Sequence, residues 1–323
     1  MNKLRGEHEI KLDADEIALI FQSDKLDNLA ELIATERESL ENILTKHKGI
    51  EFQREDGFDV DKALEDIVPE TKLGDIWQLG QHRIICADCS DDRSISNLME
   101  EHRADLVLTD PPYNLSENMQ GDYYENTNFD NMKKLEKTDW DQQFDIKPML
   151  DSIFPVLADD CTVYIFTSQY LAPVIWNWMK DWAKFYSYLV YCKPDPMPSL
   201  SKRYWTWATE LICFATRGKH IFNYNEGVHN PNYLIYSRTE AAANDHPTKK
   251  PVRLLSEIVK HSSKEDSIVF DPFLGSGSTL IACEQTNRVC YGVEIDPHYT
   301  DVCVKRWEAF TGKKAVKLTS EGT

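Results

Sequence analysis

The chain has 323 residues, of which 41% are hydrophobic and 28% charged, so it is long enough for one large α/β domain or two smaller ones. It contains no run of eighteen apolar residues, and its first residues, MNKLRGEHEIKLDADE, lack the apolar stretch of a signal peptide; a cytoplasmic protein with no membrane span is expected. The net charge of −18 argues against a nucleic-acid partner, because DNA affinity depends largely on Lys and Arg meeting phosphates.

Positive charge is unevenly distributed along the chain. Residues 180–260 contain 12 lysines and arginines against 7 acids, a local net charge of +5. Such a zone is compatible with a DNA-binding face, and a partner of another kind stays open. Of the eight cysteines, only Cys86 and Cys89 have metal-like spacing, and no second pair completes a zinc site. Reduced thiols and no metal are predicted.

The first 50 residues place apolar side chains at helical spacing in IALIF, LDNLAELI and LENIL, between acids and lysines. This pattern predicts an acidic helical arm. Residues 51–72 are polar and contain a proline, which is typical of a linker. We therefore expect residues 1–72 to form an arm and linker outside the main domain.

From Leu73 onward, short strand-like runs alternate with helical stretches. Several of the strand-like runs are almost continuously apolar, which is typical of strands covered on both faces. The alternation predicts an α/β fold with a doubly wound, mostly parallel, Rossmann-like sheet of seven strands. The strands are expected at 83–87, 105–109, 161–167, 185–192, 210–216, 267–271 and 289–295, and helices near 149–158, 171–183, 250–261, 276–286 and 297–310.

A predicted strand ends in the stretch LTDPPYNL. Proline has no backbone N–H for a sheet ladder and fixes its own φ, so Pro111 and Pro112 must stop the strand. Asp110 and Tyr113 are therefore expected in a stiff turn at its end. A plain turn that closes a core strand is the alternative interpretation.

A second informative stretch is VFDPFLGSGSTLIACEQ, in which a strand ends at Asp271 and a turn with Gly275 and Gly277 opens a helix. Glycines let the backbone approach a ligand, and a helix N-terminus offers free N–H groups. Glu294 and Asp296 end the next strand, where an acid can accept hydrogen bonds from ribose hydroxyls. The pattern predicts a nucleoside-type cofactor site, although GSGST is neither the NAD fingerprint nor a Walker loop.

Together, DPPY and DPFLGSGST resemble the motif pair of S-adenosylmethionine-dependent DNA amino-methyltransferases, and Asp-Pro-Pro-Tyr is similar to the adenine-N6 type. DPPY comes first, which is the order of the permuted β group. HPTKKP, residues 246–251, looks like the family's segment closing over the methionine end of the cofactor. CADCSD around Asp88 looks like the acidic turn that the family places near the cofactor's adenine.

The resemblance covers about residues 73–312 and implies a circularly permuted class I methyltransferase acting on double-stranded DNA. It implies methyl transfer from S-adenosylmethionine to the N6 amine of an adenine flipped out of the duplex. The implied division is a catalytic half at 73–192, a target-recognition region at about 193–247 plus the loop 115–146, a cofactor half at 246–312 and a tail at 313–323.

The implied catalytic residues are Asp110, Pro111, Pro112 and Tyr113. An exocyclic amine is a poor nucleophile because its lone pair is delocalised into the ring. The Asp110 carboxylate and the Pro111 carbonyl would each accept one N–H, which aims the lone pair and stabilises positive charge developing on nitrogen. Tyr113 offers a ring for the base to stack on. No metal is needed, because the sulfonium of the donor is already activated.

Two further groups of residues follow from the resemblance and from the basic zone, with Lys250 favoured for the cofactor's carboxylate. The cofactor-binding group comprises Asp88, Asp110, His246, Thr248, Lys250, Asp271, Phe273, Gly275, Ser276, Gly277, Thr279, Glu294, Ile295 and Asp296. The candidate DNA contacts are Asn114, Lys193, Lys202, Arg203, Arg217, Lys219 and Arg238, while Trp205 and Trp207 are expected in the core.

Other amine substrates stay open: cytosine N4, an RNA adenine or a protein glutamine. Asp110 in place of Ser or Asn favours adenine. An inactive methyltransferase-like subunit of a complex is the alternative from another class, and the presence of both motif halves argues against it. A homodimer, a cognate restriction enzyme and a nucleoid-associated location in a bacterium or phage are compatible with the family but are not decided by the sequence.

Overall fold

The computed structural model describes residues 55–113, 144–194, 196, 205–223, 230–237 and 249–318. The chain divides into two units, residues 1–53 with 224–231 and residues 54–223 with 232–323, and the sheet belongs to the second. The predicted arm at 1–50 and nearly all of the loop 115–146 lie outside the described residues.

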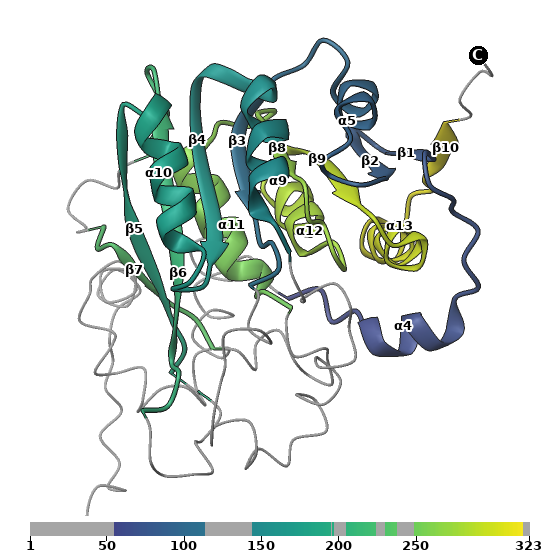
Figure 1. Cartoon of the computed structure of the whole chain (residues 1–323). Helices are drawn as coiled ribbons and strands as arrows, with labels where there is room; N and C mark the ends of the chain where they lie inside the picture. Colours follow the sequence, from purple (N-terminus) through teal and green to yellow (C-terminus); the bar gives the residue numbers. More distant parts are fainter. Residues whose placement is uncertain are drawn as a thin grey trace, which may run out of the picture. The chain divides into compact units, whose positions relative to one another are not determined.

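Ten strands of the described part form one sheet in the order β10-β1-β2-β9-β8-β3-β4-β6-β5-β7 (Figure 1). The five strands from β2 to β4 are parallel, β6 is antiparallel to both β4 and β5, and β1 pairs antiparallel with β2 and β10. The strands are β1 (Ile76–Leu79), β2 (His82–Cys86), β3 (Ala104–Thr109), β4 (Leu157–Thr167), β5 (Phe185–Cys192), β6 (Thr209–Arg217), β7 (Tyr233–Ile235), β8 (Ile268–Asp271), β9 (Val289–Glu294) and β10 (Val316–Leu318).

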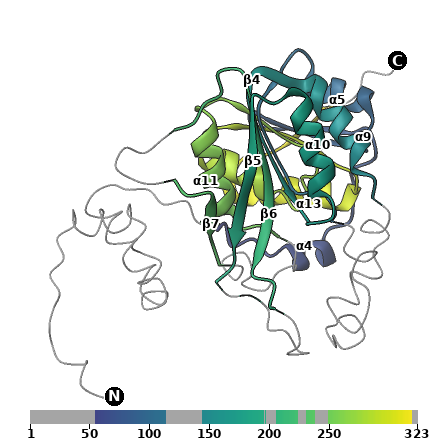
Figure 2. The same ribbon diagram turned by 60° about the vertical axis from the view of Figure 1, so that its left-hand side comes forward.

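The seven predicted strands are all present and form a contiguous block, β2-β9-β8-β3-β4-β6-β5. The mostly parallel, doubly wound α/β sheet is confirmed. Figure 2 brings forward the side of the sheet that carries β5 and β7. The three additional strands, β1, β7 and β10, lie at the ends of the block and have only three or four residues each. Runs this short give no readable period-2 pattern, which is why the sequence did not indicate them.

Helices cover both faces of the sheet: α5, α9 and α10 pack on one face, and α11, α12 and α13 on the other (Figure 1). No helix among the described residues is both long and apolar enough to cross a bilayer. The helices are α4 (Val60–Asp66), α5 (Asp92–Met99), α9 (Ile146–Ile153), α10 (Ala172–Trp182), α11 (Val252–Ser262), α12 (Ser278–Gln285) and α13 (Pro297–Thr311), with a short 3-10 turn at Phe154–Val156.

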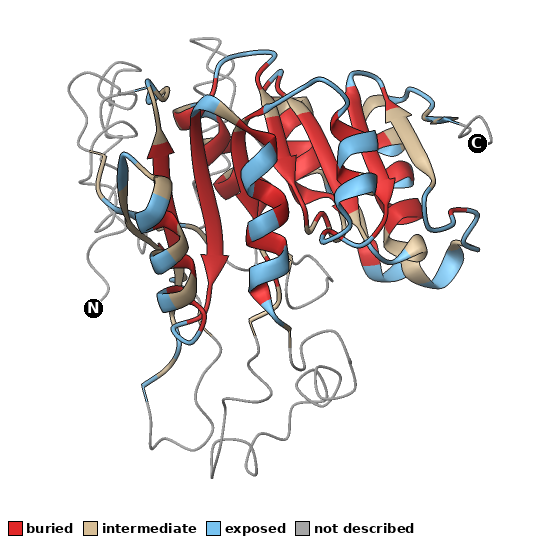
Figure 3. Cartoon of the chain, turned by 45° about the horizontal axis from the view of Figure 1, so that its top comes forward, coloured by how far each residue is buried: buried red, intermediate tan, exposed pale blue. Residues whose placement is uncertain are grey.

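Strand β3 shows why apolar residues run on without alternation. Leu106 and Leu108 pack with the α11–α13 side, whereas Val107 between them packs with the α5–α10 side, and all three are fully buried. Figure 3 shows the central strands buried between helices whose outer sides are exposed. A strand with two covered faces needs an apolar residue at every position, so the sequence reads as an unbroken run.

Helix α13 begins and ends as its sequence predicts. The Asp296 side chain accepts a hydrogen bond from the His298 N–H at 2.7 Å, and Pro297 occupies the first helical position. Gly312 closes the helix with a left-handed φ of 71°, a conformation that glycine adopts without a Cβ penalty.

The segment after residue 54 corrects the predicted linker. Helix α4 packs Val60 and Ala63 against Val302 of α13. Arg306 of α13 forms a two-point ion pair with Asp56, at 2.5 Å (Nε–Oδ2) and 2.9 Å (Nη2–Oδ1), with both side chains almost fully buried. Residues 55–72 therefore belong to the sheet domain, because Asp56 pairs with Arg306 and the backbone N–H groups of residues 70 and 71 donate to Asp301 of α13.

The predicted C-terminal tail needs the same correction. Residues 316–318 form β10, which pairs with β1 and extends the sheet at its edge. A three-residue edge strand of this kind gains its stability from backbone pairing rather than from apolar side chains.

The buried Asp56–Arg306 pair yields a test of the domain boundary. Replacing Asp56 with Asn leaves a fully buried guanidinium without its counter-ion, a change that typically costs about 3–5 kcal/mol of unfolding free energy. We expect a loss of that order in urea denaturation of the full chain. Glu65→Gln on the exposed side of α4 is the control and should change stability by less than about 0.5 kcal/mol. Equal effects of the two substitutions would contradict the buried pair.

Candidate active site

The two motif strands lie side by side at the centre of the sheet. β3 and β8 are parallel neighbours, with Leu106 opposite Val269 and Val107 opposite Phe270. From this point the chain runs outward in opposite directions, from β8 to β9 and from β3 to β4. Ligands of doubly wound folds bind at such a reversal, beyond the carboxyl ends of the strands. Asp110 and Asp271 both stand at that edge, as predicted.

At the end of β3, Asp110 is held by two donors. Its Oδ1 accepts a hydrogen bond from the Tyr113 hydroxyl at 2.5 Å, and its Oδ2 forms an ion pair with the Lys250 ammonium. The ammonium also lies 5.4 Å from the centre of the Tyr113 ring and 5.1 Å from that of Phe166. The carboxylate and the aromatic ring of the DPPY turn are thus joined directly.

Lys250 was predicted to approach the cofactor's carboxylate, and the structure gives it different partners. Its ammonium lies between the carboxylates of Asp110 and Glu210, with 3.2 Å to the Glu210 Oε2, and its side chain is largely buried. These two carboxylates together neutralise the charge of the Lys250 ammonium. The lysine therefore belongs to the group around Asp110.

Glu210 is a site residue that sequence reasoning missed. It lies in β6, and its Oε2 is 3.3 Å from the Tyr113 hydroxyl while its Oε1 pairs with Lys193. The available signal was a glutamate opening the apolar run ELICFAT, where a charge on a half-buried strand needs a partner. Lys193, predicted as a phosphate contact, is that partner and is mostly buried.

The charges in this cluster shift the acidity of its members. Burial alone would raise the pKa of the Glu210 carboxyl, but Lys250 and Lys193 outweigh burial and lower it to about 2. Burial raises the pKa of Asp110 above its ordinary value, against the opposing effect of Lys250. Burial would lower the pKa of Lys250, yet the two carboxylates raise it. Lys250 is therefore a permanent cation between two acids.

The glycine turn after β8 has the conformation that its sequence predicts. Gly275 and Gly277 have φ of 53° and 86°, and Gly277 caps the N-terminus of α12. A Cβ on Gly275 would meet open space, whereas one on Gly277 would lie 3.1 Å from the Cys303 Sγ. The turn therefore packs against α13 at Gly277 and borders open space at Gly275, where a ligand could approach the backbone.

Glu294 at the end of β9 holds this turn. Its Oε2 accepts a hydrogen bond from the Gly275 N–H at 2.8 Å and its Oε1 accepts one from the Asp296 N–H at 2.9 Å. Burial raises the pKa of the Glu294 carboxyl to about 7. Each oxygen keeps a second lone pair, so the carboxylate can still accept hydrogen bonds from a ligand.

Buried side chains support the turn from beneath. Asp271 accepts a hydrogen bond from the Phe273 N–H at 3.0 Å, and burial raises the pKa of its carboxyl to about 6 despite a hydrogen bond from Thr279. Arg306, the partner of Asp56, donates to the Ser276 carbonyl at 3.0 Å. The turn is therefore fixed to α13 and, through it, to residue 56.

The remaining cofactor candidates flank the turn. Asp88 is exposed after β2, and its Oδ1 accepts hydrogen bonds from the Ser90 N–H and hydroxyl at 2.8 and 2.7 Å. The Ala87 N–H donates to the Glu294 carbonyl at 2.9 Å, which sets this turn beside Glu294. Ile295 is exposed next to it. His246 and Thr248 lie outside the described residues.

Two of the predicted DNA contacts lie away from this edge. Arg217 is opposite Cys161 in the first half of β4, whereas the Asp110 end of the sheet corresponds to Thr167 and Leu211. The Lys219 N–H donates to Asp160 at the same far edge. The antiparallel direction of β6 carries both residues there, so they do not join the site. Asn114, Lys202, Arg203 and Arg238 lie outside the described residues.

Trp205 and Trp207 correct another expectation. They were expected in the core, but Trp205 is 93% and Trp207 49% exposed. Both precede β6, so neither lies within the covered sheet layer where an apolar side chain would be buried.

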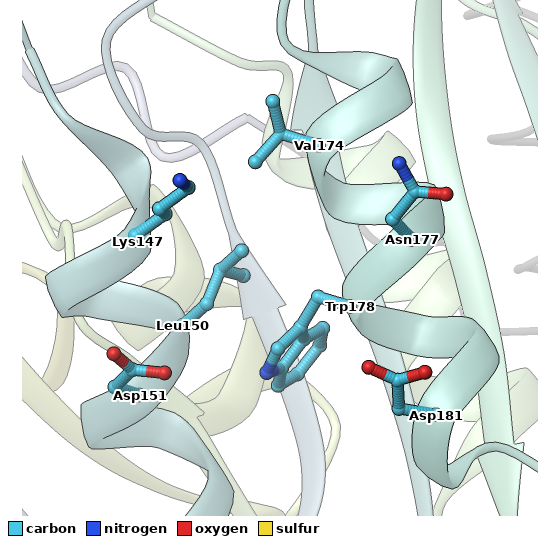
Figure 4. Close-up of a pocket in the computed structure, with 7 residues that line it drawn as sticks. All are labelled: Lys147, Leu150, Asp151, Val174, Asn177, Trp178 and Asp181. Atoms are coloured by element: carbon cyan, nitrogen blue, oxygen red, sulfur yellow. The ribbon is translucent and has the colours of Figure 1, made fainter.

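A groove of about 490 Å³ lies between α9 and α10, lined by two aspartates, a lysine and apolar side chains (Figure 4). It opens between helices of one layer rather than at the carboxyl ends of the strands. The site is therefore assigned to the strand ends. The lining residues are Lys147, Leu150, Asp151, Val174, Asn177, Trp178 and Asp181.

A match to a known protein family shows which kind of protein carries these two turns. The family model described as DNA methylase matches residues 104–305, from the start of β3 into α13. The chain belongs to the DNA methylase family. The matched span contains both motif strands, Glu210 and Lys250.

Individual relatives agree with this membership. The DNA methylase is 29% identical to the type II methyltransferase M2.DpnII of Streptococcus pneumoniae over 68% of this chain and 88% of that protein. It is 27% identical to the type II methyltransferase M.HpaI of Haemophilus parainfluenzae over 70% of this chain and 74% of that protein.

Two solved structures share the fold. The crystal structure of the M1.HpyAVI–SAM complex superposes with a TM-score of 0.53 at 22% identity, over 69% of this chain and 98% of that one. The cytosine-N4-specific PvuII DNA methyltransferase gives a TM-score of 0.53 at 16% identity, over 73% and 92%. These likenesses confirm the class I methyltransferase fold of this DNA methylase.

The glycine turn offers a matched pair of substitutions. Ala at either position meets the left-handed backbone, which costs about 1–2 kcal/mol. At Gly277 the new Cβ also crowds the Cys303 Sγ, and overpacking of this kind adds about 1–3 kcal/mol. Gly277→Ala is therefore expected to lower the urea midpoint further than Gly275→Ala. The reverse ranking would show that the turn packs differently.

Proposed function

We propose that this DNA methylase transfers a methyl group from S-adenosylmethionine to the N6 amine of an adenine flipped out of double-stranded DNA. The observation that carries the proposal is the parallel pairing of β3 with β8. It brings the DPPY turn and the glycine turn to one edge of the sheet. A group proposed to hold an amine and a group proposed to hold a nucleoside cofactor therefore share one edge of the sheet.

The residues around the glycine turn fit S-adenosylmethionine. The space above Gly275 is open, and the Glu294 carboxylate keeps free lone pairs for ribose hydroxyls. We assign Asp88 to the adenine end and Asp271, Phe273, Ser276, Gly277 and Thr279 to the shape of the cradle. Bound there, S-adenosylmethionine supplies a methyl group already activated by its sulfonium.

The DPPY turn supplies the amine side of the reaction. The Asp110 carboxylate accepts one amine N–H and the Pro111 carbonyl accepts the other, which turns the nitrogen lone pair out of the ring plane. Asp110 also stabilises positive charge as it develops on nitrogen. Pro112 keeps the turn rigid, and the Tyr113 ring stacks on the base. The ion pair with Lys250 lowers the pKa of the Asp110 carboxyl, against the larger effect of burial.

DNA must present the amine outside the duplex, because an adenine in the stack cannot reach a crevice at a sheet edge. The loop 115–146 and the region 193–247 are proposed to hold the opened strand. A homodimer and an accompanying restriction enzyme stay predictions.

Cytosine N4 is the competing amine, and the fold does not decide between the two, since the PvuII enzyme is described as cytosine-N4-specific. The aspartate of DPPY favours adenine. Incubation with plasmid DNA and isotopically labelled S-adenosylmethionine, followed by nucleoside analysis, distinguishes them. N6-methyladenine is expected. N4-methylcytosine as the labelled product would overturn the base assignment, and label confined to RNA or protein would overturn the substrate class.

Removal of the Asp110 carboxylate should separate binding from chemistry. Asp110→Ala deletes the amine acceptor but none of the groups around the glycine turn. Methyl transfer to plasmid DNA is expected to fall at least about 100-fold, because a preorganised charge at the reacting nitrogen is lost. Cofactor affinity by calorimetry should change less than threefold. An active variant would remove Asp110 from the mechanism.

Glu294 predicts the pH dependence of cofactor binding. With a pKa of about 7, its carboxyl is ionised at pH 8 and mostly protonated at pH 6. Protonation removes an acceptor for ribose hydroxyls, so affinity should fall on going from pH 8 to pH 6, by up to about tenfold per pH unit below the pKa. Calorimetry across this range measures it. Glu294→Gln should bind more weakly at pH 8 and lose most of the pH dependence; parallel curves for the two proteins would exclude Glu294.

A further inference from the structure

The Asp110 carboxylate already has a partner on each oxygen. Tyr113 donates to Oδ1 and Lys250 to Oδ2. A carboxylate bonded in this way is a weaker acceptor for an incoming amine, and a cation in contact opposes positive charge developing nearby. The arrangement raises the question of what happens to the two donors when an amine arrives.

Both donors share a second acceptor. The Oε2 of Glu210 is 3.2 Å from the Lys250 Nζ and 3.3 Å from the Tyr113 hydroxyl. These are the same two groups that contact Asp110. Neither donor would need to travel to change its main partner, because both already lie within hydrogen-bond reach of Glu210.

Glu210 is itself fixed in position. Its other oxygen pairs with Lys193, and Lys193 N–H donates to the Ala208 carbonyl at 2.7 Å, which continues the β5–β6 ladder. Lys193 and Lys250 flank one carboxylate that remains strongly ionised. The cluster contains two carboxylates and two ammonium groups, so its total charge is balanced whichever acid Lys250 favours.

We propose that Glu210 is a positioning residue that takes over Lys250 and the Tyr113 hydroxyl when the target amine binds, and so releases Asp110 to accept that amine. Glu210 does not touch the reacting atoms; it acts through Lys250 and Tyr113. The inference rests on the amine-holding role of Asp110 in the proposed function. No bond is made or broken in the step, and the proton of each donor stays on its own group.

Glu210→Gln tests the idea, because it keeps the size of the side chain and removes its charge. Lys250 then has Asp110 as its one remaining anionic partner in the cluster and stays with it. Single-turnover methyl transfer with saturating cofactor and DNA is expected to slow about 10- to 100-fold. Cofactor affinity by calorimetry and DNA affinity by fluorescence anisotropy should each change less than threefold. Glu65→Gln, on the exposed side of α4, is the matched control and should keep the wild-type rate.

A double-mutant cycle separates this role from a structural one. If Glu210 acts by drawing Lys250 away, Glu210→Gln should slow the Lys250→Met enzyme less than threefold. An equal slowing in both backgrounds would overturn the proposal. If Glu210→Gln fails to bind cofactor, Lys193→Met replaces it; loss of this outer anchor is expected to slow transfer at least threefold, and an unchanged rate would overturn the proposal.

The proposed function and this inference fail in different ways. A wild-type enzyme that yields no N6-methyladenine contradicts the proposed function. A wild-type enzyme that yields it, together with a Glu210→Gln variant of unchanged single-turnover rate, contradicts only the role of Glu210.

Discussion

The hydrogen-bonded ladder between β3 and β8 is the constraint on which the site depends. Residues more than 160 positions apart in sequence, Asp110 and Asp271, come to one edge because two parallel strands are paired there. Both strands are covered on two faces, so their register is set by buried side chains that cannot slip by one residue without reversing every contact. The positions of the two turns are consequences of that register.

Charge in the site is organised as a balanced set rather than as a single catalytic acid. Asp110 pairs with Lys250, Lys250 also contacts Glu210, and Glu210 pairs in turn with Lys193. Isolated buried charges are very costly, whereas a set of four with alternating sign can be kept ionised away from bulk water. Such a set also lets one member change its partner without a change in total charge. This property suits the amine-holding role proposed for Asp110.

Much of the fold could be predicted from the sequence, and so could the two turns that meet at one edge of the sheet. The apolar run around Val107 indicates a strand covered on both faces, and Gly275 and Gly277 indicate a turn with positive φ. Both features depend only on residues that are close in sequence. Glu210 could not be found in this way, since its importance comes from contacts with residues 97 positions earlier and 40 positions later in the chain. Arg217 was wrongly predicted as a DNA contact for the same reason. Basic residues that are close in sequence lie at opposite edges of the sheet, because β6 runs antiparallel to β4.

The brace from Asp56 through Arg306 to the Ser276 carbonyl has a consequence for protein engineering. It means that the sheet domain begins upstream of its first strand, at about residue 55. A fusion protein that begins at β1 would lack Asp56, and the buried Arg306 guanidinium beside the glycine turn would have no counter-ion. Grafts of this domain onto other DNA-targeting scaffolds therefore need their splice point before this acidic anchor.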